Sequence, residues 1–569
     1  MACNDDLTQP RATTKLNATQ LLALATLATG RQDVSFPLSA KLHDIKASAT
    51  TYVEPSPPDS PTSGDRNAED EDAQSSLELV LEYADQVSKK MLQPGHEDVH
   101  ASRELLRFLI DYVQQTVLST RNIHTVVASF PIPDSQKSKL LRSYYEALHA
   151  ANVNTHAQES GLFGTTIYTV FGGQGLRGNC VEELREITTT YPSLTRDLIH
   201  ASATLITNLS VMDAVGSQLF PQGFDILAWL RDPAQVPDST YLTFAPVSVP
   251  LIGLVQLVHY EVTCKTLGLT PGQFRSRIAG STGHSQGIIA AAATAVADDW
   301  PSWQEATRAA ITTLFWIGVR TQQAWNSVQC NNAVSEAMVQ DSIDHGERAP
   351  SPMLSVRGLT RENLQRCVDA TNRYLKQGGR CLSISMTNGL RHFVISGPPK
   401  YLYGLNLQIR RAKQLLVQQR SAGDGGKADV VGSRFLDVSV PFHTNWLDQA
   451  IPMIQNDVKD VWLQPSAMAI PVFSTEDGQD TGCEGGQESR ENVLHKLVEL
   501  VVSRSVDWGK ATACLYPDPD PDPESTLATR TVLDFGPGGV HGISSLSSST
   551  GGSRIILAGT FRGKGDLFL

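Results

Sequence analysis

Ser285 is the residue of this chain best placed to do chemistry. It lies between Gly283 and Gly287 in the stretch STGHSQGIIAAAATAVA, where small apolar residues follow for two helical turns. In Gly-x-Ser-x-Gly the glycines allow a sharp turn from a strand into a helix, which exposes the serine hydroxyl at the start of the helix. A turn before a buried alanine-rich helix would give the same pattern, so the motif alone leaves a catalytic and a structural interpretation open.

A serine that accepts an acyl group also needs a base and an oxyanion hole. Histidine is the usual base, and His443 follows an apolar strand and a proline in SVPFHTNW, where a loop could hold it at the edge of a site. A loop histidine hydrogen-bonded to backbone is the alternative. The N–H of Gln286 is the geometric candidate for the oxyanion hole, and Gln174, after a predicted strand, could supply the second donor. His284 is expected to point away from the serine hydroxyl.

Two short patterns typical of nucleotide-binding proteins occur in the sequence without the other motif residues that normally accompany them. Residues Gly173 to Gly178 match G-x-G-x-x-G, but Asp197, at about the right distance for a ribose contact, lies in a helical pattern rather than at the end of a strand. The DFG at residues 534–536 is accompanied by neither an HRD motif nor a Walker lysine. The sequence therefore predicts no dinucleotide and no kinase function.

Composition and charge set the class of protein. The chain has 569 residues, of which 41% are hydrophobic and 19% charged, which suits more than one globular domain. A net charge of −12 argues against binding to nucleic acid or to anionic membranes. None of the eight cysteines forms a CxxC pair, so we expect no metal site, no disulfide framework and a cytoplasmic protein with reduced thiols.

Two apolar stretches have some features of a targeting or membrane segment. Residues 21–30 (LLALATLATG) could be the core of a signal peptide, but Asp5 and Asp6 precede them and residues 17–20 (NATQ) read as a helix cap, so we favour a short amphipathic helix. Residues 244–260 contain two prolines, a Gln and a His, and we interpret them as too short and too broken to span a bilayer.

Changes in local composition and in the spacing of apolar residues divide the chain into several predicted regions. Residues 1–53 form a short N-terminal segment, and residues 54–76, rich in Pro, Ser and acid, are expected to be a disordered linker. Residues 77–154 have helical apolar spacing and predict a helical N-terminal domain. From 155 to 569, helical patterns alternate with short apolar strands, which argues for an α/β fold. The strands expected there include TTIYTVF, RSRIAGSTG, FVISG and TVLDF.

An ordered set of motifs resembles the acetyltransferase domain of the fungal fatty acid synthase β subunit, a member of the malonyl/acyl transferase superfamily. In chain order these are FGGQG, GFDILAWLRDP, PVSVPLIGLVQLVHYEVTCKTLGLTPG, GSTGHSQGIIAAA, LFWIGVR, SPMLSV, NGLRHFVISGPPKYLYGLN, SVPFH and LDFGPGG. They extend over roughly residues 77–559. GHSxG with a later His belongs to the wider superfamily, whereas GVRTQQA and GPPKYLYGLNL are closer to the fungal synthase.

The resemblance implies a fold and a mechanism. The fold would be a large α/β-hydrolase-like subdomain with a small ferredoxin-like subdomain inserted at about 352–437. Ser285 would be the nucleophile and His443 the general base, as a dyad without a third carboxylate. Gln174 and the Gln286 amide match the oxyanion region, and Asn388 matches a pocket-lining position. His284 is grouped with Asn388 in the substrate site.

One departure from the family concerns the acyl group. Malonyl-transferring relatives carry an arginine before a glycine in the helix that follows the serine, and here Ile317 precedes Gly318. An isoleucine cannot pair with a carboxylate, so the acyl group is expected to be neutral. Arg320, about one turn further on, is expected to be structural.

A second departure is length. The enoyl reductase, dehydratase and malonyl/palmitoyl transferase domains of a fungal β subunit do not follow here, so the chain is either an excised domain or a free-standing transferase. We expect a transferase that moves an acetyl or longer starter group from acyl-CoA to an acyl carrier protein in fatty-acid or polyketide synthesis, with no metal and no bound cofactor. A serine esterase or thioesterase and a non-catalytic subunit of a synthase are the alternatives.

Overall fold

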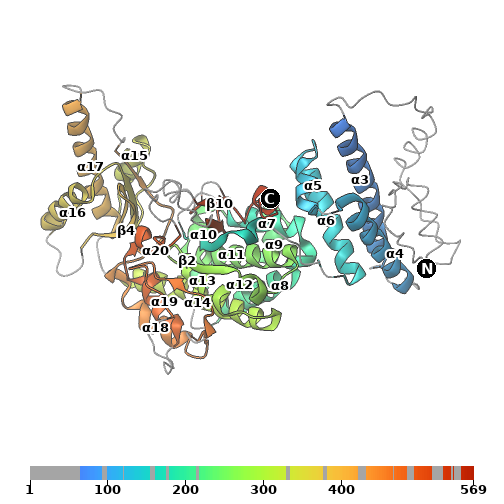
Figure 1. Cartoon of the computed structure of the whole chain (residues 1–569). Helices are drawn as coiled ribbons and strands as arrows, with labels where there is room; N and C mark the ends of the chain where they lie inside the picture. Colours follow the sequence, from blue (N-terminus) through green and yellow to red (C-terminus); the bar gives the residue numbers. More distant parts are fainter. Residues whose placement is uncertain are drawn as a thin grey trace, which may run out of the picture. The chain divides into compact units, whose positions relative to one another are not determined.

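The computed structural model divides the chain into two compact units, which are described separately here (Figure 1). The smaller unit contains the described residues up to 155, together with Thr188–Leu194 and Phe568, and the larger unit contains the rest. The structure describes residues 65–91, 99–119, 121–153, 155, 161–174, 179–212, 217–328, 333–375, 381–420, 431–464, 467–482, 492–515, 530–539, 542–543 and 553–568. The predicted segment 1–53, with its expected amphipathic helix, lies outside these residues.

The smaller unit is helical, as the apolar spacing predicts. Helices α3, α4 and α6 pack on one another through buried leucines and tyrosines, among them Leu106 and Tyr144. Their bounds, with the short helices between them, are α3 Asp65–Met91, α4 Val99–Tyr112, the π-helix η1 Val113–Leu118, α5 Ile123–Ser129 and α6 Asp134–Ala151.

The predicted disordered linker is wrong for residues 65–76, because α3 begins at Asp65. Every proline of that linker lies before this point, as does its one glycine, Gly64. Residues 65–76 contain neither, so nothing in the backbone interrupts the helix that starts there and continues through Leu77. The remainder of the predicted linker, residues 54–64, lies outside the described residues.

A parallel five-stranded sheet forms the centre of the larger unit. The strand order is β10-β9-β1-β2-β7, with every neighbouring pair parallel. The strands are β1 Thr166–Phe171, β2 Ile278–Gly283, β7 Val472–Phe473, β9 Arg530–Asp534 and β10 Arg554–Ile556. Ligands of open α/β sheets bind outside the carboxyl ends of the strands, where the chain leaves in opposite directions. Here β1 has β2 on one side and β9 on the other, so the loops after these three strands meet.

The helices of the larger unit include two long ones, α11 and α14, which pack on each other and on α13. The elements that lie wholly or mostly in this unit are α7 Cys180–Thr190, α8 Pro192–Ser210, α9 Ile226–Arg231, α10 Ser239–Thr243, α11 Ala245–Leu267, α12 Pro271–Arg275, α13 Gly287–Val296, α14 Trp300–Ser327, α15 Glu336–Asp344, α16 Arg361–Leu375, α17 Pro399–Arg420, α18 Ala450–Asp457, α19 Val493–Val502, α20 Trp508–Ala511 and α22 Phe561–Asp566. Short 3-10 turns are η2 Gly161–Gly164, η3 Ser217–Leu219, η4 Pro233–Gln235 and η5 Asn445–Leu447.

The apolar stretch weighed as a membrane span is a continuous helix. Although α11 contains Pro250, it runs unbroken for 23 residues, so the expectation of a short, broken segment is wrong. The helix is long and apolar enough to cross a membrane by composition, but the whole of its apolar window is buried inside the protein. A helix that is apolar on all sides suits the core of a large domain.

A second five-stranded sheet is formed mainly by residues 353–435, within the predicted insertion at 352–437. Its order is β6-β3-β5-β4-β8, in which β3, β4, β5 and β6 are antiparallel neighbours and β8 is parallel to β4. The chain order through the insertion is strand, helix, strand, strand, helix, strand. These strands are β3 Met353–Arg357, β4 Ser383–Gly389, β5 His392–Ser396, β6 Gly432–Phe435 and β8 Val506–Asp507.

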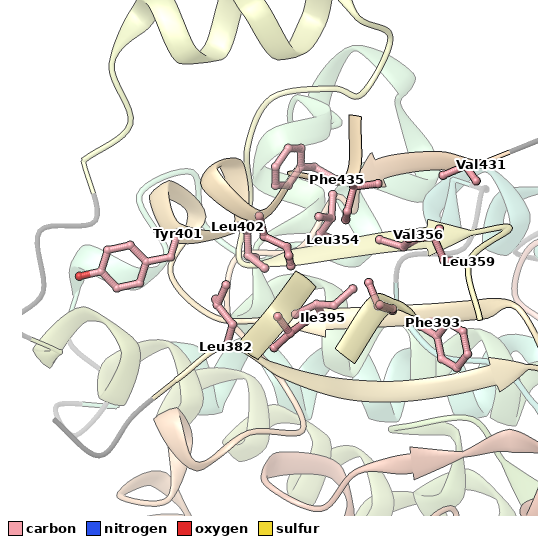
Figure 2. Packing of buried hydrophobic residues seen from close by; sticks show 14 residues of the cluster. Leu354, Val356, Leu359, Leu382, Phe393, Ile395, Tyr401, Leu402, Val431 and Phe435 are labelled. Atoms are coloured by element: carbon pink, nitrogen blue, oxygen red, sulfur yellow. The ribbon is translucent and has the colours of Figure 1, made fainter. Parts of the chain in front are cut away.

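A separate hydrophobic core holds this second sheet together. Figure 2 shows Leu354, Ile395 and Phe435 on the strands, with Leu402 from α17 among them. Helices α16 and α17 pack on each other and supply further residues of the cluster, among them Leu364 and Leu405. The small sheet therefore has its own apolar core, beside that of the parallel sheet.

Truncation of this core should loosen the small sheet. Leu354→Ala removes a fully buried side chain and should lower the free energy of unfolding by about 2–5 kcal/mol. Leu390→Ala, at a side chain 95% exposed in the β4–β5 turn, should change it by less than about 0.5 kcal/mol. Urea denaturation of both variants measures the difference. Equal losses would show that the cluster around Leu354 does not determine stability.

Candidate active site

Ser285 occupies a sharp turn between β2 and α13. Its φ is 55°, in the left-handed region that side chains rarely adopt. A Cβ on Gly283 would collide with the backbone of Gly287, and a Cβ on Gly287 would collide with the carbonyls of Phe171 and Gly172 at the end of β1. Both glycines are therefore required for the turn to pack against β1. This is the strained strand-to-helix turn that the GxSxG spacing predicts.

The serine hydroxyl is hydrogen-bonded to His443. Ser285 Oγ lies 2.7 Å from His443 Nε2, and both residues are buried, with 6% and 2% of their surface exposed. His443 Nδ1 lies 2.8 Å from the backbone carbonyl of Arg504. A carbonyl can only accept, so Nδ1 carries the proton and Nε2 offers a lone pair to the serine. The tautomer required of a general base is thus set by a carbonyl rather than by a carboxylate.

His443 is held from two sides by the end of α19. Its backbone N–H donates to the carbonyl of Val502 at 2.9 Å, and its side chain donates to the carbonyl of Arg504 just beyond the helix. The φ of His443 is 61°, so the loop after β6 is fixed in a conformation that few residues adopt. Carbonyls at a helix C-terminus favour positive charge, so they would stabilise the imidazolium that forms when His443 takes a proton.

Burial sets the protonation state of this histidine. Removal from water lowers the pKa of His443 to about 4, which outweighs the upward effect of the hydrogen bond to the Arg504 carbonyl. His284 lowers the pKa of His443 slightly further. His443 is therefore neutral near pH 7 and able to accept the serine proton.

His284 and Asn388 form a second buried pair beside the serine. His284 Nε2 lies 2.9 Å from Asn388 Oδ1, and the imidazole packs edge-on against Trp508 with ring centroids 5.2 Å apart. Burial lowers the pKa of His284, partly offset by the bond to Asn388, so this imidazole is neutral as well. The pair joins the turn at Ser285 to strand β4 of the small sheet, and the resemblance alone did not indicate that these two residues bond to each other.

The loop after β1 closely approaches the serine. A Cβ on Gly173 would lie 2.7 Å from the carbonyl oxygen of His284 and 3.2 Å from the Cβ of Ser285, so only glycine fits there. The backbone N–H of Gln286 donates to no acceptor among the described residues, as an oxyanion donor requires. The geometry of the nucleophile turn thus leaves this N–H available at the serine.

The side chains of Gln174 and Gln286 are hydrogen-bonded to neighbouring helices. Gln174 Nε2 donates to the carbonyl of Thr243 at 2.9 Å and to Ser248 Oγ at 2.7 Å. Gln286 Nε2 donates to the carbonyl of Val249 at 3.0 Å. The amide groups of both side chains are therefore engaged with the segment that forms α10 and α11. Any part that Gln174 has in an oxyanion hole falls to its backbone N–H.

Ile317 and Arg320 lie on α14, which packs against the helix of the serine. Ile317 is fully buried. Arg320 makes a two-pronged ion pair with Asp457, from Nε to Oδ2 at 2.6 Å and from Nη2 to Oδ1 at 3.0 Å. Its guanidinium also lies over the ring of Trp316. The charge of Arg320 is thus compensated by a partner of its own, which agrees with the structural role predicted for it.

The sequence did not predict the residues that support Ser285, His443 and His284 through backbone groups or packing. The carbonyl of Arg504 leaves no signal, because any residue type could supply it. Trp508 lies in a mixed polar and apolar stretch without a motif. Gln256, whose side chain donates to the carbonyl of Gly172 after β1, could have been found because it is the one amide side chain of α11. Among the described residues, no group of three or more His, Cys, Asp or Glu side chains could hold a metal ion.

Comparison with known proteins places these features in a family. Residues 169–422 match the model of the starter unit:ACP transacylase of aflatoxin biosynthesis, and residues 26–151 match that of the N-terminal domain of fatty acid synthase subunit beta. A fatty acid synthase beta subunit of Cochliobolus carbonum, TOXC, is 39% identical over 86% of this chain and 23% of its own length. The beta subunit of Saccharomyces cerevisiae is 34% identical over 87% of the chain and 24% of its own length.

Among solved structures, the malonyl CoA-acyl carrier protein transacylase of Coxiella burnetii aligns with 72% of this chain and all of its own, at 16% identity and a TM-score of 0.46. The resemblance expected from the motifs is confirmed by the family models and the relatives. Over most of its length the chain is similar to fungal fatty acid synthase beta subunits, and within that length residues 169–422 match the starter-unit transacylase model. It spans about a quarter of the length of the two beta subunits named above.

The depressed pKa of His443 predicts an unusual pH profile for acylation of Ser285. A base with a pKa of about 4 stays neutral from pH 8 to 5, so the rate constant should be flat over that range and fall only below about pH 5. Because the folded pKa lies below the ordinary 6.5, the unfolded chain takes up this proton first, and the stability contributed by neutral His443 is lost as the pH falls from 6.5 toward 4.

Single-turnover acylation by p-nitrophenyl acetate, with the folded fraction checked by circular dichroism at each pH, measures this. An inflection near pH 6.5 in fully folded protein would show that His443 is not desolvated in the way the structure indicates.

Proposed function

We propose that this protein is an acyltransferase that moves a neutral acyl group from acyl-CoA to the phosphopantetheine thiol of an acyl carrier protein. The observation that carries the proposal is the 2.7 Å hydrogen bond between Ser285 Oγ and His443 Nε2. The match to a starter unit:ACP transacylase family supports the carrier protein as acceptor. The fungal beta subunits among its relatives support a role in fatty-acid or polyketide synthesis, in the cytoplasm.

The reaction has two symmetrical halves. In the first, His443 Nε2 takes the hydroxyl proton as Ser285 Oγ attacks the thioester carbonyl. The oxyanion accepts hydrogen bonds from the N–H of Gln286 and from the loop after β1, and the thiolate of CoA leaves with the proton that His443 returns. In the second half, His443 deprotonates the carrier thiol, which attacks the serine ester and restores the hydroxyl. We write both steps without a metal or a bound cofactor.

The two sheets fit this role as parts of one transferase. We propose that the parallel sheet corresponds to the α/β-hydrolase-like subdomain, and the sheet of β3 to β6 to the inserted ferredoxin-like subdomain. The first supplies Ser285, and the second supplies Asn388 beside it. The acyl chain would then lie between elements of both, with its carbonyl at the turn between β2 and α13.

Removal of the nucleophile and of the base tests the proposal directly. After incubation with acetyl-CoA or hexanoyl-CoA, the intact protein should gain one acyl group, and Ser285→Ala should gain none. His443→Ala should slow acylation by about 10²–10⁴-fold, because general-base assistance is lost. Intact-mass spectrometry with peptide mapping locates the group. An adduct that persists in Ser285→Ala would refute the assignment.

The fate of the acyl-enzyme separates the proposal from its alternatives. Retention of the acyl group until carrier protein is added, followed by its appearance on the carrier, supports a transferase. Rapid loss to water without carrier would identify an esterase or thioesterase. Failure of every acyl-CoA and ester to modify Ser285 would identify a non-catalytic subunit.

We propose that the acyl group is neutral, because Ile317 occupies the position at which malonyl-transferring relatives carry an arginine. A malonyl carboxylate in contact with this buried isoleucine would lie in an apolar environment without a counter-ion. Arg320, the next cation along α14, is already paired with Asp457, so reaching for the substrate would break a two-pronged ion pair. A starter such as acetyl, or a longer chain, fits these surroundings.

Replacement of Ile317 should change the preference for neutral acyl-CoA over malonyl-CoA. The native protein should favour acetyl- or hexanoyl-CoA over malonyl-CoA by at least about a hundredfold in kcat/KM, since an unpaired charge costs a few kcal/mol. Ile317→Arg should raise malonyl transfer and lower acetyl transfer. Ile317→Leu keeps an apolar side chain of the same volume and should leave the preference unchanged. Efficient malonyl loading by the native protein would refute the neutral-acyl proposal.

A further inference from the structure

The loop after β1 faces the nucleophile, but its position depends on contacts outside the loop. Gly173 lies against Ser285 closely enough to exclude a Cβ. The residue before it, Gly172, donates its N–H to the carbonyl of Gly536 after β9 at 2.8 Å. The carbonyls of Gly172 and Gly536 are thereby brought toward the same region, at the carboxyl ends of two neighbouring strands.

A side chain of helix α11 donates hydrogen bonds to the carbonyls of both Gly172 and Gly536. Gln256 lies near the middle of α11 and is fully buried. Its Nε2 donates to the carbonyl of Gly172 at 2.6 Å and to that of Gly536 at 3.1 Å. A primary amide has two N–H groups, and both are used here. Its Oε1 has no hydrogen-bond partner in the described part of the chain.

Burial of the Gln256 amide is unfavourable unless its N–H groups are hydrogen-bonded, which indicates that the two carbonyls require an amide at this position. The apolar part of helix α11 is buried on all sides, and an amide buried there loses its hydration. Two N–H donors that meet two carbonyls recover part of that loss, whereas no apolar side chain could hold the two carbonyls together. An acidic side chain of the same shape would place a negative charge against two carbonyl oxygens. The site therefore selects for the amide.

We propose that Gln256 is a positioning residue for acyl transfer, which fixes the loop after β1 so that its backbone can stabilise the oxyanion at Ser285. The inference rests on the proposed function, because it concerns the same reaction. Gln256 itself bonds Gly172, one residue before Gly173, and acts on the reacting atoms only through that loop. A displacement of the loop by a few tenths of an ångström would weaken a hydrogen bond that matters most in the transition state.

Gln256→Glu should make the acylation rate depend on pH, which would not be expected if Gln256 only stabilised the fold. When ionised, the carboxylate repels both carbonyls, and when protonated, its O–H can donate to one of them. Burial raises the pKa of a carboxyl group, so this side chain should titrate between about pH 5 and 8. We expect acylation to be about 10–100-fold slower than in the native protein at pH 8, and the deficit to shrink by about tenfold at pH 5.5. His443 stays neutral across this range because its pKa is about 4.

Two further variants complete the experiment. Gln256→Met removes both donors without adding charge and should slow acylation to a similar degree at every pH. Thr266→Val is the matched control, because Thr266 is a fully buried polar residue of the same helix whose hydroxyl bonds only to the carbonyl of Thr263 among the described residues. It should lower the melting temperature without changing the acylation rate of the folded protein.

The rate is measured as single-turnover acylation of Ser285 by p-nitrophenyl acetate, followed by intact-mass spectrometry over a range of ester concentrations. The maximal rate should fall while the half-saturating concentration stays the same. Variants at Gln256 that melt earlier but acylate at the native rate, or a deficit in Gln256→Glu that does not change with pH, would overturn the proposal. Because the ester requires neither CoA nor carrier protein, a native enzyme that accepts the ester but not acyl-CoA would refute the proposed donor and leave this test intact.

Discussion

The hydrogen bond between Ser285 and His443 joins two residues that are 158 positions apart in the chain, and both have a positive φ. Neither conformation is favourable in itself, so each must be imposed by its surroundings. At the serine, the absence of a Cβ on two flanking glycines lets the turn pack against β1. At the histidine, two carbonyls at the end of α19 hold the backbone and the ring. Much of the larger unit holds these two turns so that Ser285 Oγ lies 2.7 Å from His443 Nε2.

A short segment after α19 connects the separate parts of the site. The carbonyl of Arg504 orients His443, and β8, directly after it, pairs with β4, the strand that carries Asn388. Trp508, the next residue along, packs against His284. The small sheet is thus joined through five consecutive residues to both the base and the nucleophile turn. A displacement of this segment would alter the tautomer-setting bond and the His284–Asn388 pair together.

The sequence predicted that Ser285 and His443 meet, but it did not predict the contacts that hold them in place. Ser285 and His443 were found because their motifs depend on residue type, and the strands around them were found because apolar β-branched runs ended in glycines. The carbonyl of Arg504 could not be predicted, since a backbone group acts independently of the side chain that it belongs to. The linker prediction failed at residues 65–76, because acidic composition was given more weight than the absence of proline and glycine. For α11, the prolines do not break the helix as predicted, because Pro246 lies in its first turn and the helix continues past Pro250.

The electrostatics of the site bear on the class of acyl group. Two histidines at the serine, His443 and His284, have pKa values lowered chiefly by burial, so they are neutral at pH 7. Burial that keeps imidazoles neutral would also penalise a carboxylate, because both effects arise from the loss of water around a charge. A malonyl-transferring site would have to offset that penalty with a dedicated cation, and Arg320 is committed to Asp457. The same desolvation that keeps His443 neutral therefore supports the proposal that the acyl group is uncharged.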